Sequence, residues 1–238
     1  MGQQDKVNIR PQVTMLSVLK FLEYETWFAL AEFVDNAIDS YLKNEKILKA
    51  LEGKDFKLQV NIEINDAENR ITIRDNAAGI NENDYPRAFR AAEIPPDNSG
   101  LSEFGMGMKS AACWFADRWC VTTTALGEPI EKRVWFDLQK IFLDQLEELD
   151  VETTTCDKNY HYTTIELFDV NRMPRRRGIA KVKDHLRSIY REFIRNEILI
   201  LNVDGEVLKY TEPKILNVPR YDDPKGESVF WKKEISFP

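Results

Sequence analysis

The chain has 238 residues, of which 43% are hydrophobic and 31% are charged, as in one large globular domain or one and a half. The formal net charge of −7 provides no overall basic field for nucleic acid, and three cysteines are too few for a disulfide framework or a zinc site. No apolar signal region and no run of about 18 apolar residues occurs, so we expect no membrane contact and a reducing cytoplasm.

The first part of the chain predicts a polar arm followed by two helices. Residues 1–14 are polar and are expected to form the arm. Met15–Tyr24 is a candidate for a short helix. Neither glycine nor proline occurs from Val13 to Glu52, and apolar residues recur with helical period, so we predict a long helix that runs to about Leu51.

The long helix carries three polar residues in line. Positions three and four apart stack on one helical face, which places Glu32, Asn36 and Asp39 in one stripe. Such groups are costly to bury without partners on a helix that is otherwise largely apolar. The stripe is therefore either a solvated face or half of a polar site, and this segment alone leaves both readings open.

Two strands are predicted next. Apolar and polar residues alternate over Leu58–Ile64, and Ile71 and Ile73 continue the alternation on a second strand. Asp75 is next in this period of two, so its carboxylate is predicted to share the inward face with the two isoleucines. A carboxylate at the core end of a strand needs a donor from the protein or from a ligand. Gly79 then allows close approach to the backbone.

A glycine-rich turn follows. Tyr85–Glu93 is predicted as a short helix, and Ile94–Gly100 has the composition of a loop that can move over a site. Gly105 and Gly107 precede a predicted helix from about Lys109 to Trp119. Free amides and the helix dipole make such a turn an anion site. The alternative is an ordinary helix start with flexible glycines.

The second half of the chain predicts three more strands, an acidic helix and a hairpin. The strand candidates are Cys120–Ala125, Arg133–Leu138 and His161–Phe168, and the acidic helix between the last two is Ile141–Leu149. The hairpin is expected from Ile198 to Tyr210, because its Asp-Gly pair suits a tight turn with positive φ.

One basic region stands out against the acidic whole. It runs from Arg172 to Arg195, with Arg175–Arg177 in front of a predicted amphipathic helix. A solvated helix face and a local contact with phosphate or nucleic acid are both open readings. The chain ends in a strand candidate after Ser228, so we expect a fragment of a longer protein.

Three segments, in this order, resemble the motifs of the GHKL ATPase superfamily, which includes gyrase B, the ninety-kilodalton heat-shock chaperones, MutL and the histidine kinases. They are Leu30–Tyr41, Ile71–Ile80 and Gly100–Ser110. The first and third are most similar to those of the MORC-like ATPases and their bacterial relatives. The resemblance implies a Bergerat-type α/β (α+β) two-layer sandwich, with a mixed, mostly antiparallel sheet covered by helices on one face. It assigns 15–170 to the ATP-binding domain and 171–238 to its continuation or to the start of a transducer-like second domain.

The resemblance also implies ATP as substrate, Mg²⁺ as cofactor and a role for each motif residue. Glu32 would be the general base, Asn36 would bind Mg²⁺ through its amide oxygen, and Asp75 would accept from the adenine amino group. Lys109 would act on the β- and γ-phosphates. Asp39 would position water or the adenine end, although a structural ion pair explains it equally well. The other implied ATP contacts are Gly79, Ile80, Gly105, Met106, Gly107, Met108 and Thr163.

Two positions depart from the superfamily pattern. Tyr162 replaces the glycine that precedes the motif threonine, so an ordinary strand threonine is the alternative for Thr163. Ala77 replaces a usual glycine, and a turn with positive φ would disfavour alanine.

We therefore expect Mg²⁺-dependent ATP hydrolysis that drives nucleotide-dependent homodimerisation, with the DNA handling or defence role that the resemblance implies. Two alternatives stay open. One is a histidine-kinase catalytic domain, although neither His161 nor His185 has the expected His-Glu context. The other is a nucleotide-binding scaffold without hydrolysis, which would not need Glu32. The client of such a motion is not readable from the sequence.

Overall fold

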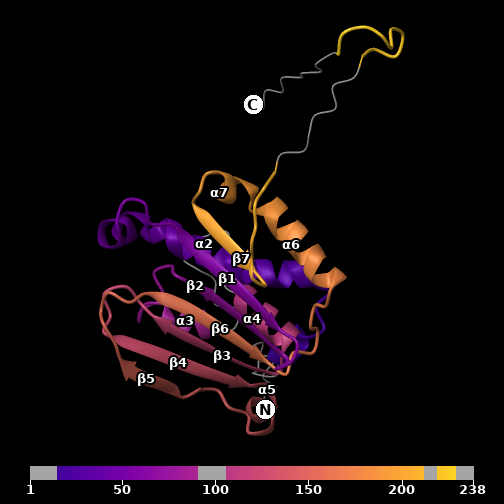
Figure 1. Cartoon of the computed structure of the whole chain (residues 1–238). Coiled ribbons are helices and arrows are strands. Elements are labelled where there is room, and N and C mark those ends of the chain that lie inside the picture. The colour runs from indigo at the N-terminus through magenta and orange to yellow at the C-terminus, as the bar shows by residue number, and fades with distance from the viewer. Residues whose placement is uncertain (1–14, 91–105, 212–218, 229–238) are drawn as a thin grey trace, which may run out of the picture.

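An eight-stranded sheet forms one layer of the fold, and helices form the other (Figure 1). The computed structural model describes residues 15–90, 106–211 and 219–228. The strands are β1 Leu58–Asn65, β2 Arg70–Asp75, β3 Arg118–Thr124, β4 Ile130–Asp137, β5 Val151–Thr155, β6 Tyr162–Phe168, β7 Leu199–Val203 and β8 Glu206–Val207. The helices are α1 Met15–Leu19, α2 Thr26–Glu52, α3 Tyr85–Phe89, α4 Gly107–Phe115, α5 Leu138–Leu143, α6 Arg177–Ile189 and α7 Arg191–Arg195.

The sheet is mixed and mostly antiparallel. Its strand order is β5-β4-β3-β6-β2-β1-β7-β8. The pairing of β1 with β7 is parallel, and the other neighbouring pairs are antiparallel. Figure 1 shows α2 and α4 on the far side of the strands, where α2 packs on β1 and α4 packs on α2. The predicted two-layer α/β fold with helices on one face is confirmed.

The strands bury one face because apolar and polar residues alternate along them. On β1, Leu58, Val60 and Ile62 are almost fully buried, while the residues between them are at least partly exposed. On β2, Ile71 and Ile73 are buried in the same way. Since successive side chains point to opposite faces, this alternation directs a continuous apolar surface toward the helical layer.

The long helix α2 spans 27 residues and confirms the sequence prediction. No residue that breaks helices interrupts it, and it ends where Gly53 takes a φ of 108°, which favours glycine. Leu30, Val34 and Ile38 are fully buried on its apolar face. Packing of this apolar face therefore fixes the position of the polar stripe on α2 relative to the sheet.

Several predicted boundaries are wrong, for tertiary reasons. The helix expected over Lys109–Trp119 is α4, which ends at Phe115 because Trp119 belongs to β3 and stacks on Phe136 of β4. The acidic helix expected over Ile141–Leu149 is the shorter α5. The short strand β5 follows it, and the sequence did not predict that strand.

The other helices are also shorter than predicted. Met15–Tyr24 contains only the five residues of α1 as helix, and the described part of Tyr85–Glu93 contains α3. The basic helix is divided at Tyr190 into α6 and α7. The expected arm at 1–14, the loop at 94–100 and most of the strand after Ser228 lie outside the described residues.

The segment after residue 170 extends the same sheet. β7 pairs with β1, the first strand of the hairpin that β1 forms with β2, and α6 packs on α2 (Figure 1). The turn between β7 and β8 has positive φ at Asp204 and Gly205, as the predicted hairpin requires. Among the described residues, no helix combines the length and the apolar character needed to cross a membrane.

Candidate active site

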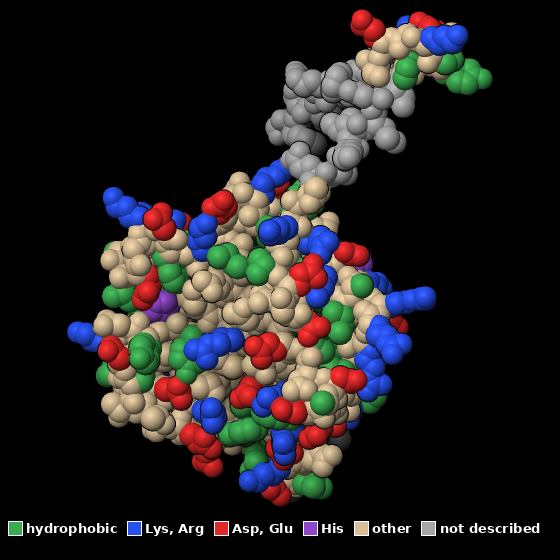
Figure 2. Space-filling view, in the orientation of Figure 1, with side chains coloured by type: hydrophobic (Ala, Val, Ile, Leu, Met, Phe, Trp, Pro, Cys, Tyr) green, Lys and Arg blue, Asp and Glu red, His purple; other side chains and the backbone are tan. Residues whose placement is uncertain are grey.

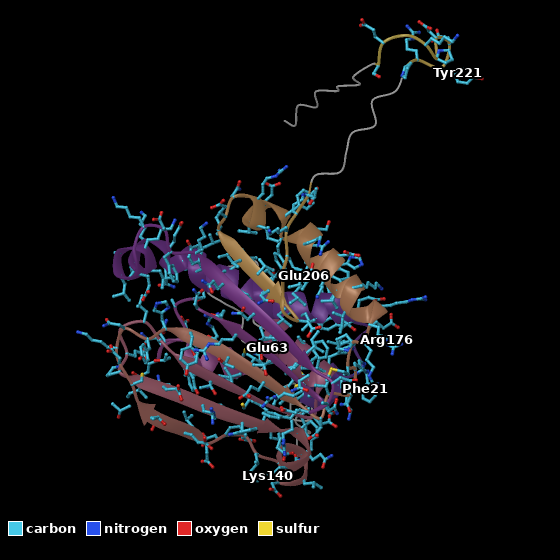
Figure 3. All side chains as sticks on the ribbon, viewed as in Figure 1. Phe21, Glu63, Lys140, Arg176, Glu206 and Tyr221 are labelled. Carbon is cyan, nitrogen blue, oxygen red and sulfur yellow. The ribbon has the colours of Figure 1, made fainter. Side chains whose placement is uncertain are left out.

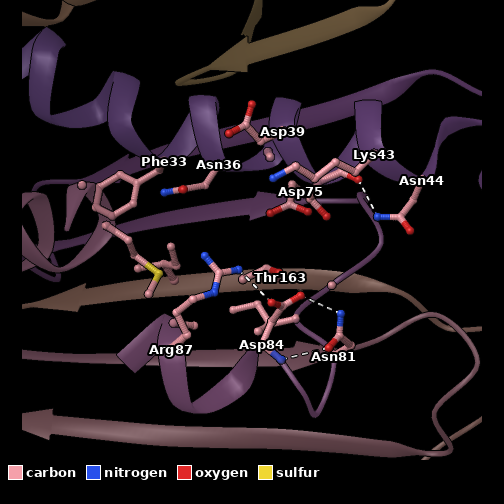
Figure 4. Close-up of a pocket in the computed structure, with 18 of the residues that line it drawn as sticks. Phe33, Asn36, Asp39, Lys43, Asn44, Asp75, Asn81, Asp84, Arg87 and Thr163 are labelled. Atoms are coloured by element: carbon pink, nitrogen blue, oxygen red, sulfur yellow. Dashed lines mark hydrogen bonds and ion pairs between the residues drawn. The ribbon is translucent and has the colours of Figure 1, made fainter. Parts of the chain in front are cut away.

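A cavity of about 210 Å³ opens between α2 and α3 above the strand ends of β2 and β6 (Figure 4). Its wall brings together residues from all three motif segments. The predicted site residues that line it are Asn36, Asp39, Asp75, Gly79, Ile80, Gly107, Met108, Lys109 and Thr163. Glu32 does not line the cavity but lies against Gly107, which does. Met106 packs against the core, and Gly105 lies outside the described residues.

Helix α2 supplies the polar stripe. Asn36 donates from Nδ2 to the main-chain oxygen of Glu32 at 2.7 Å, which fixes the plane of its amide group. Asp39 lies one turn further along α2 and is only 8% exposed. The side chains of Asn36 and Asp39 reach the cavity together (Figure 4). The stripe is therefore part of a polar site rather than a solvated face.

Glu32 lies against the start of α4. A Cβ atom on Gly107 would overlap the Glu32 carboxylate, so only glycine permits this approach. Burial raises the pKa of Glu32, and the nearby charge of Asp35 raises it further. A carboxylate with a raised pKa is a better proton acceptor than an ordinary glutamate at the surface.

Asp75 and Thr163 form the floor of the cavity. They are register partners across β2 and β6, and the Asp75 carboxylate accepts from the main-chain amides of Ala77, at 2.9 Å, and Thr163. Burial raises the pKa of Asp75 to about 7 although these hydrogen bonds oppose the rise. The Thr163 hydroxyl is 3.3 Å from that of Thr123. The floor thus presents a carboxylate whose pKa is raised well above the usual value for aspartate.

The loop after β2 needs its glycine at position 79. Gly79 has a φ of 72°, and a Cβ there would overlap the main-chain oxygen of Thr124. The next amide, that of Ile80, donates to Thr123 Oγ1 at 3.0 Å and holds the loop on β3. Ala77 does not have a positive φ, so the conformation that would disfavour alanine does not occur there.

Lys109 connects α4 to α3. Its side chain is almost fully buried, and Nζ donates to the main-chain oxygens of Ala88, at 2.8 Å, and Arg87, at 3.4 Å. These carbonyls lie at the C-terminal end of α3, where a cation is favoured. The ammonium therefore joins two elements that both line the cavity.

Sequence reasoning missed the outer part of the cavity. Lys43 and Asn44 extend the polar stripe by one turn of α2, a signal that helical spacing contains. Arg87 belongs to α3, Asp84 precedes its first residue and Asn81 lies in the loop before it, and Asp84 accepts from both other side chains at 2.8 Å. Burial favours a higher pKa for Asp84, but the bonds from Arg87 and Asn81 outweigh it and lower that pKa.

A second unpredicted contact supports α2 from behind. The buried Tyr190, between α6 and α7, donates to Asp35 Oδ1 at 2.7 Å, and its hydroxyl is 3.0 Å from the main-chain oxygen of Ala31. Burial raises the pKa of Asp35 to about 6 even though the Tyr190 hydrogen bond opposes this. Because Asp35 is three residues from Glu32, this contact anchors the turn that bears the candidate base.

The basic region lies away from the cavity. Arg175 pairs with Asp66 at 2.9 Å, and Lys183 and Arg187 of α6 both reach Glu206 on the hairpin. Figure 3 labels Arg176 and Glu206 on this side of the molecule. Acidic and basic side chains are also interspersed on the face shown in Figure 2. These pairs reduce the positive charge that the region presents to a phosphate backbone.

The model of the family described as histidine kinase-, DNA gyrase B-, and HSP90-like ATPase matches residues 24–165. The chain belongs to this family. The matched range includes Glu32, Asp75 and Gly107. No curated protein matches the chain by sequence.

A solved structure shows the same fold. The crystal structure of the ATPase and transducer domains of DNA topoisomerase II from Balamuthia mandrillaris is similar to 76% of this chain, with a TM-score of 0.55 and 15% identity. The similarity covers 48% of that structure, so this chain spans about half of its length. At this level of identity the likeness supports the architecture alone.

Proposed function

We propose that the chain binds ATP with Mg²⁺ in the cavity between α2 and α3 and hydrolyses the γ-phosphate bond. The observation that carries this proposal is the position of Glu32 against Gly107 at the start of α4. A helix N-terminus attracts phosphate through its free amides, and a glutamate beside it is placed to accept a proton from an attacking water.

The cavity wall suits the two ends of ATP. Asp75 on the floor provides an acceptor for the adenine amino group, and Gly79 allows close approach of the base. Lys43 and Lys109 add positive charge to the wall. Phosphate oxygens are stabilised by such cations and by main-chain amides.

The donor set also fits magnesium. Asn36 places an amide in the cavity, and Mg²⁺ prefers oxygen ligands and needs few from the protein when phosphates supply the others. When bound, the ion neutralises charge on the phosphates. Asn36 would hold the ion, and Glu32 would remove the proton of the attacking water. Asp75 would orient the adenine ring.

The assignment of the base is tested by Glu32→Ala. We expect turnover to fall by about 100-fold or more, since a general base contributes about 10²–10⁴ to the rate. ATP affinity should change little, because the base acts on water rather than on the ligand. Glu45→Ala is the matched control, since Glu45 is on the same helix and pairs with Lys49 away from the cavity. Hydrolysis at the parent rate by Glu32→Ala, with ATP still bound, would favour the non-hydrolysing scaffold instead.

The histidine-kinase alternative finds no support in the two histidines. His161 is buried, and its Nδ1 is 2.9 Å from the main-chain oxygen of Ala77. His185 stacks on Trp27 with ring centroids 4.5 Å apart. A phosphoacceptor must expose its imidazole to a second protein or domain, and both rings are engaged in packing.

We also propose that bound ATP favours a homodimer of a MORC-like kind, as the sequence motifs suggest. ATP can shift this equilibrium only by its preference for the dimer, which ADP should lack. Light scattering without nucleotide, with ADP and with a non-hydrolysable ATP analogue tests this, and a variant lacking residues 1–13 tests the arm. The same mass in all three states at saturation would contradict the proposal. Nucleic-acid contact through Arg175–Arg177 and α6 stays a prediction.

A further inference from the structure

Arg87 enters the cavity from the side that faces α2. It belongs to the short helix α3, and its guanidinium points across the cavity toward Asn36 and Phe33 (Figure 4). The side chain is 29% exposed, so it is largely held by its surroundings. The motif segments of the sequence do not include it.

The guanidinium is held by an ion pair that a ligand can share or displace. Arg87 Nη2 lies 2.8 Å from Asp84 Oδ1, and this bond uses one of the five N–H donors of a guanidinium. Asp84 is 48% exposed and also accepts from Asn81. An ion pair of such exposure contributes little stability, about 0–1 kcal/mol. Competition from Asp84 is therefore modest.

The end of the cavity that Arg87 faces has the features of a phosphate site. Asn36 lies toward this end in Figure 4, Gly107 lines the same cavity, and the Lys109 ammonium binds the main-chain oxygen of Arg87 itself. In Figure 4, Asn81 lies on the opposite side of Asp84 from Arg87, toward the far end of the cavity. Of the two ends, Arg87 is therefore nearer to Asn36.

We propose that Arg87 is a ligand of the nucleotide's phosphate chain, an inference that rests on the proposed ATP site. A guanidinium remains charged at all physiological pH values and binds phosphate oxygens through paired N–H donors. Its contribution grows with the number of phosphates on the ligand and vanishes for the bare nucleoside. Through Asp84, ligand binding then also changes the hydrogen bonds at the start of α3.

Calorimetric titration with adenosine, AMP, ADP and ATP in the presence of Mg²⁺ tests the proposal on the full chain. Arg87→Ala should weaken ATP binding by about 10- to 100-fold, the range for a hydrogen bond to a charged group. The loss should be smaller for ADP and AMP and absent for adenosine. Arg87→Lys keeps the positive charge but lacks the paired N–H donors of the guanidinium, so it should recover part of the ATP affinity lost in Arg87→Ala.

Arg90→Ala is the matched control, because Arg90 ends the same helix but lines a different cavity, beside Phe89 and Phe136. It should bind all four ligands as the parent does. Thermal unfolding of each variant identifies loss of fold, and Arg87→Gln replaces Arg87→Ala if that variant does not fold.

An equal loss for adenosine and ATP would show a structural effect, and an unchanged ATP affinity would show no contact. If the parent binds ATP, either result overturns the proposed role of Arg87 but leaves the proposed ATP site in place. A parent that binds none of the four ligands removes the proposed function, and the role of Arg87 with it.

Discussion

Replacing Asp75 by asparagine should stabilise the fold at alkaline pH while it weakens adenine recognition. Burial raises the pKa of Asp75 to about 7, so the folded protein binds a proton that the unfolded chain has already released. Stability from this group is complete below about pH 4 and is lost as pH rises to about 7, because over this range the unfolded chain has released a proton that the folded state still holds. The asparagine side chain of the variant does not titrate and therefore does not lose this stability.

The size of the effect follows from the pKa. A pKa of about 7 in place of 3.8 corresponds to about 4 kcal/mol at high pH, since each unit is worth about 1.4 kcal/mol. Between about pH 5 and about pH 8, the parent should lose about 2–3 kcal/mol of unfolding free energy that the variant keeps. Asparagine also turns an N–H donor toward the amides of Ala77 and Thr163, at a cost that does not depend on pH.

Urea unfolding of parent and Asp75→Asn across this pH range measures the difference in slope, in which the constant cost cancels. Asp55→Asn, at an exposed position, is the control and should follow the parent. Binding of ATP and GTP to the parent and to Asp75→Asn completes the test, with ATP preferred by the parent and the preference reduced in the variant. Parallel stability curves for parent and variant would refute the reasoning from burial.

Two substitutions test the supports of the site. Gly79→Ala should cost about 2–4 kcal/mol in denaturant unfolding, because it adds strain at positive φ to an overlap with β3; Gly127→Ala has positive φ and open space, so it should cost clearly less. Tyr190→Phe keeps the ring but removes the donor to Asp35, and should cost about 1–3 kcal/mol. Since that hydrogen bond lowers the pKa of Asp35, the loss should be larger at about pH 8 than at about pH 5, and a loss independent of pH would contradict this account.

The features that the sequence predicted well are those in which burial follows a local period. The alternation through Ile71 and Ile73 predicted that Asp75 shares their face, and the register of β2 with β6 places it beside Thr163. Helical spacing likewise placed Asn36 and Asp39 on one side of α2. In both cases one element decides the direction of the side chain, so no knowledge of its neighbours is needed.

Strand β5 shows where such reasoning ends. All five of its residues, Val151–Thr155, are exposed, so no alternation of apolar and polar residues indicates a strand. Main-chain pairing with β4 alone defines it, with Val151 opposite Val134. An edge strand of this kind depends on a partner that is distant in the sequence, and periodicity carries no information about that partner.

The outer wall of the cavity was missed for the same reason. Arg87 lines the cavity only because α3 lies across it from α2. Tyr190 reaches Asp35 only because α6 packs on α2. The sequence separations are too long for a spacing rule. The motif resemblance did not predict these residues either, because its three segments lie on α2, around the end of β2 and at the start of α4.

Lys109 was predicted in part: the sequence motif identified the residue, but its hydrogen-bond partners depend on the tertiary structure. Its motif predicted a cation at the phosphate turn, and the structure places it on the cavity wall, but its ammonium binds the main-chain oxygens of Arg87 and Ala88. A main-chain acceptor has no signature in the sequence, so this partner could not be predicted. Since the buried ammonium joins the start of α4 to the end of α3, we expect a displacement at the start of α4 to reach the helix that bears Arg87. The nucleotide's phosphates would then act on both cations together.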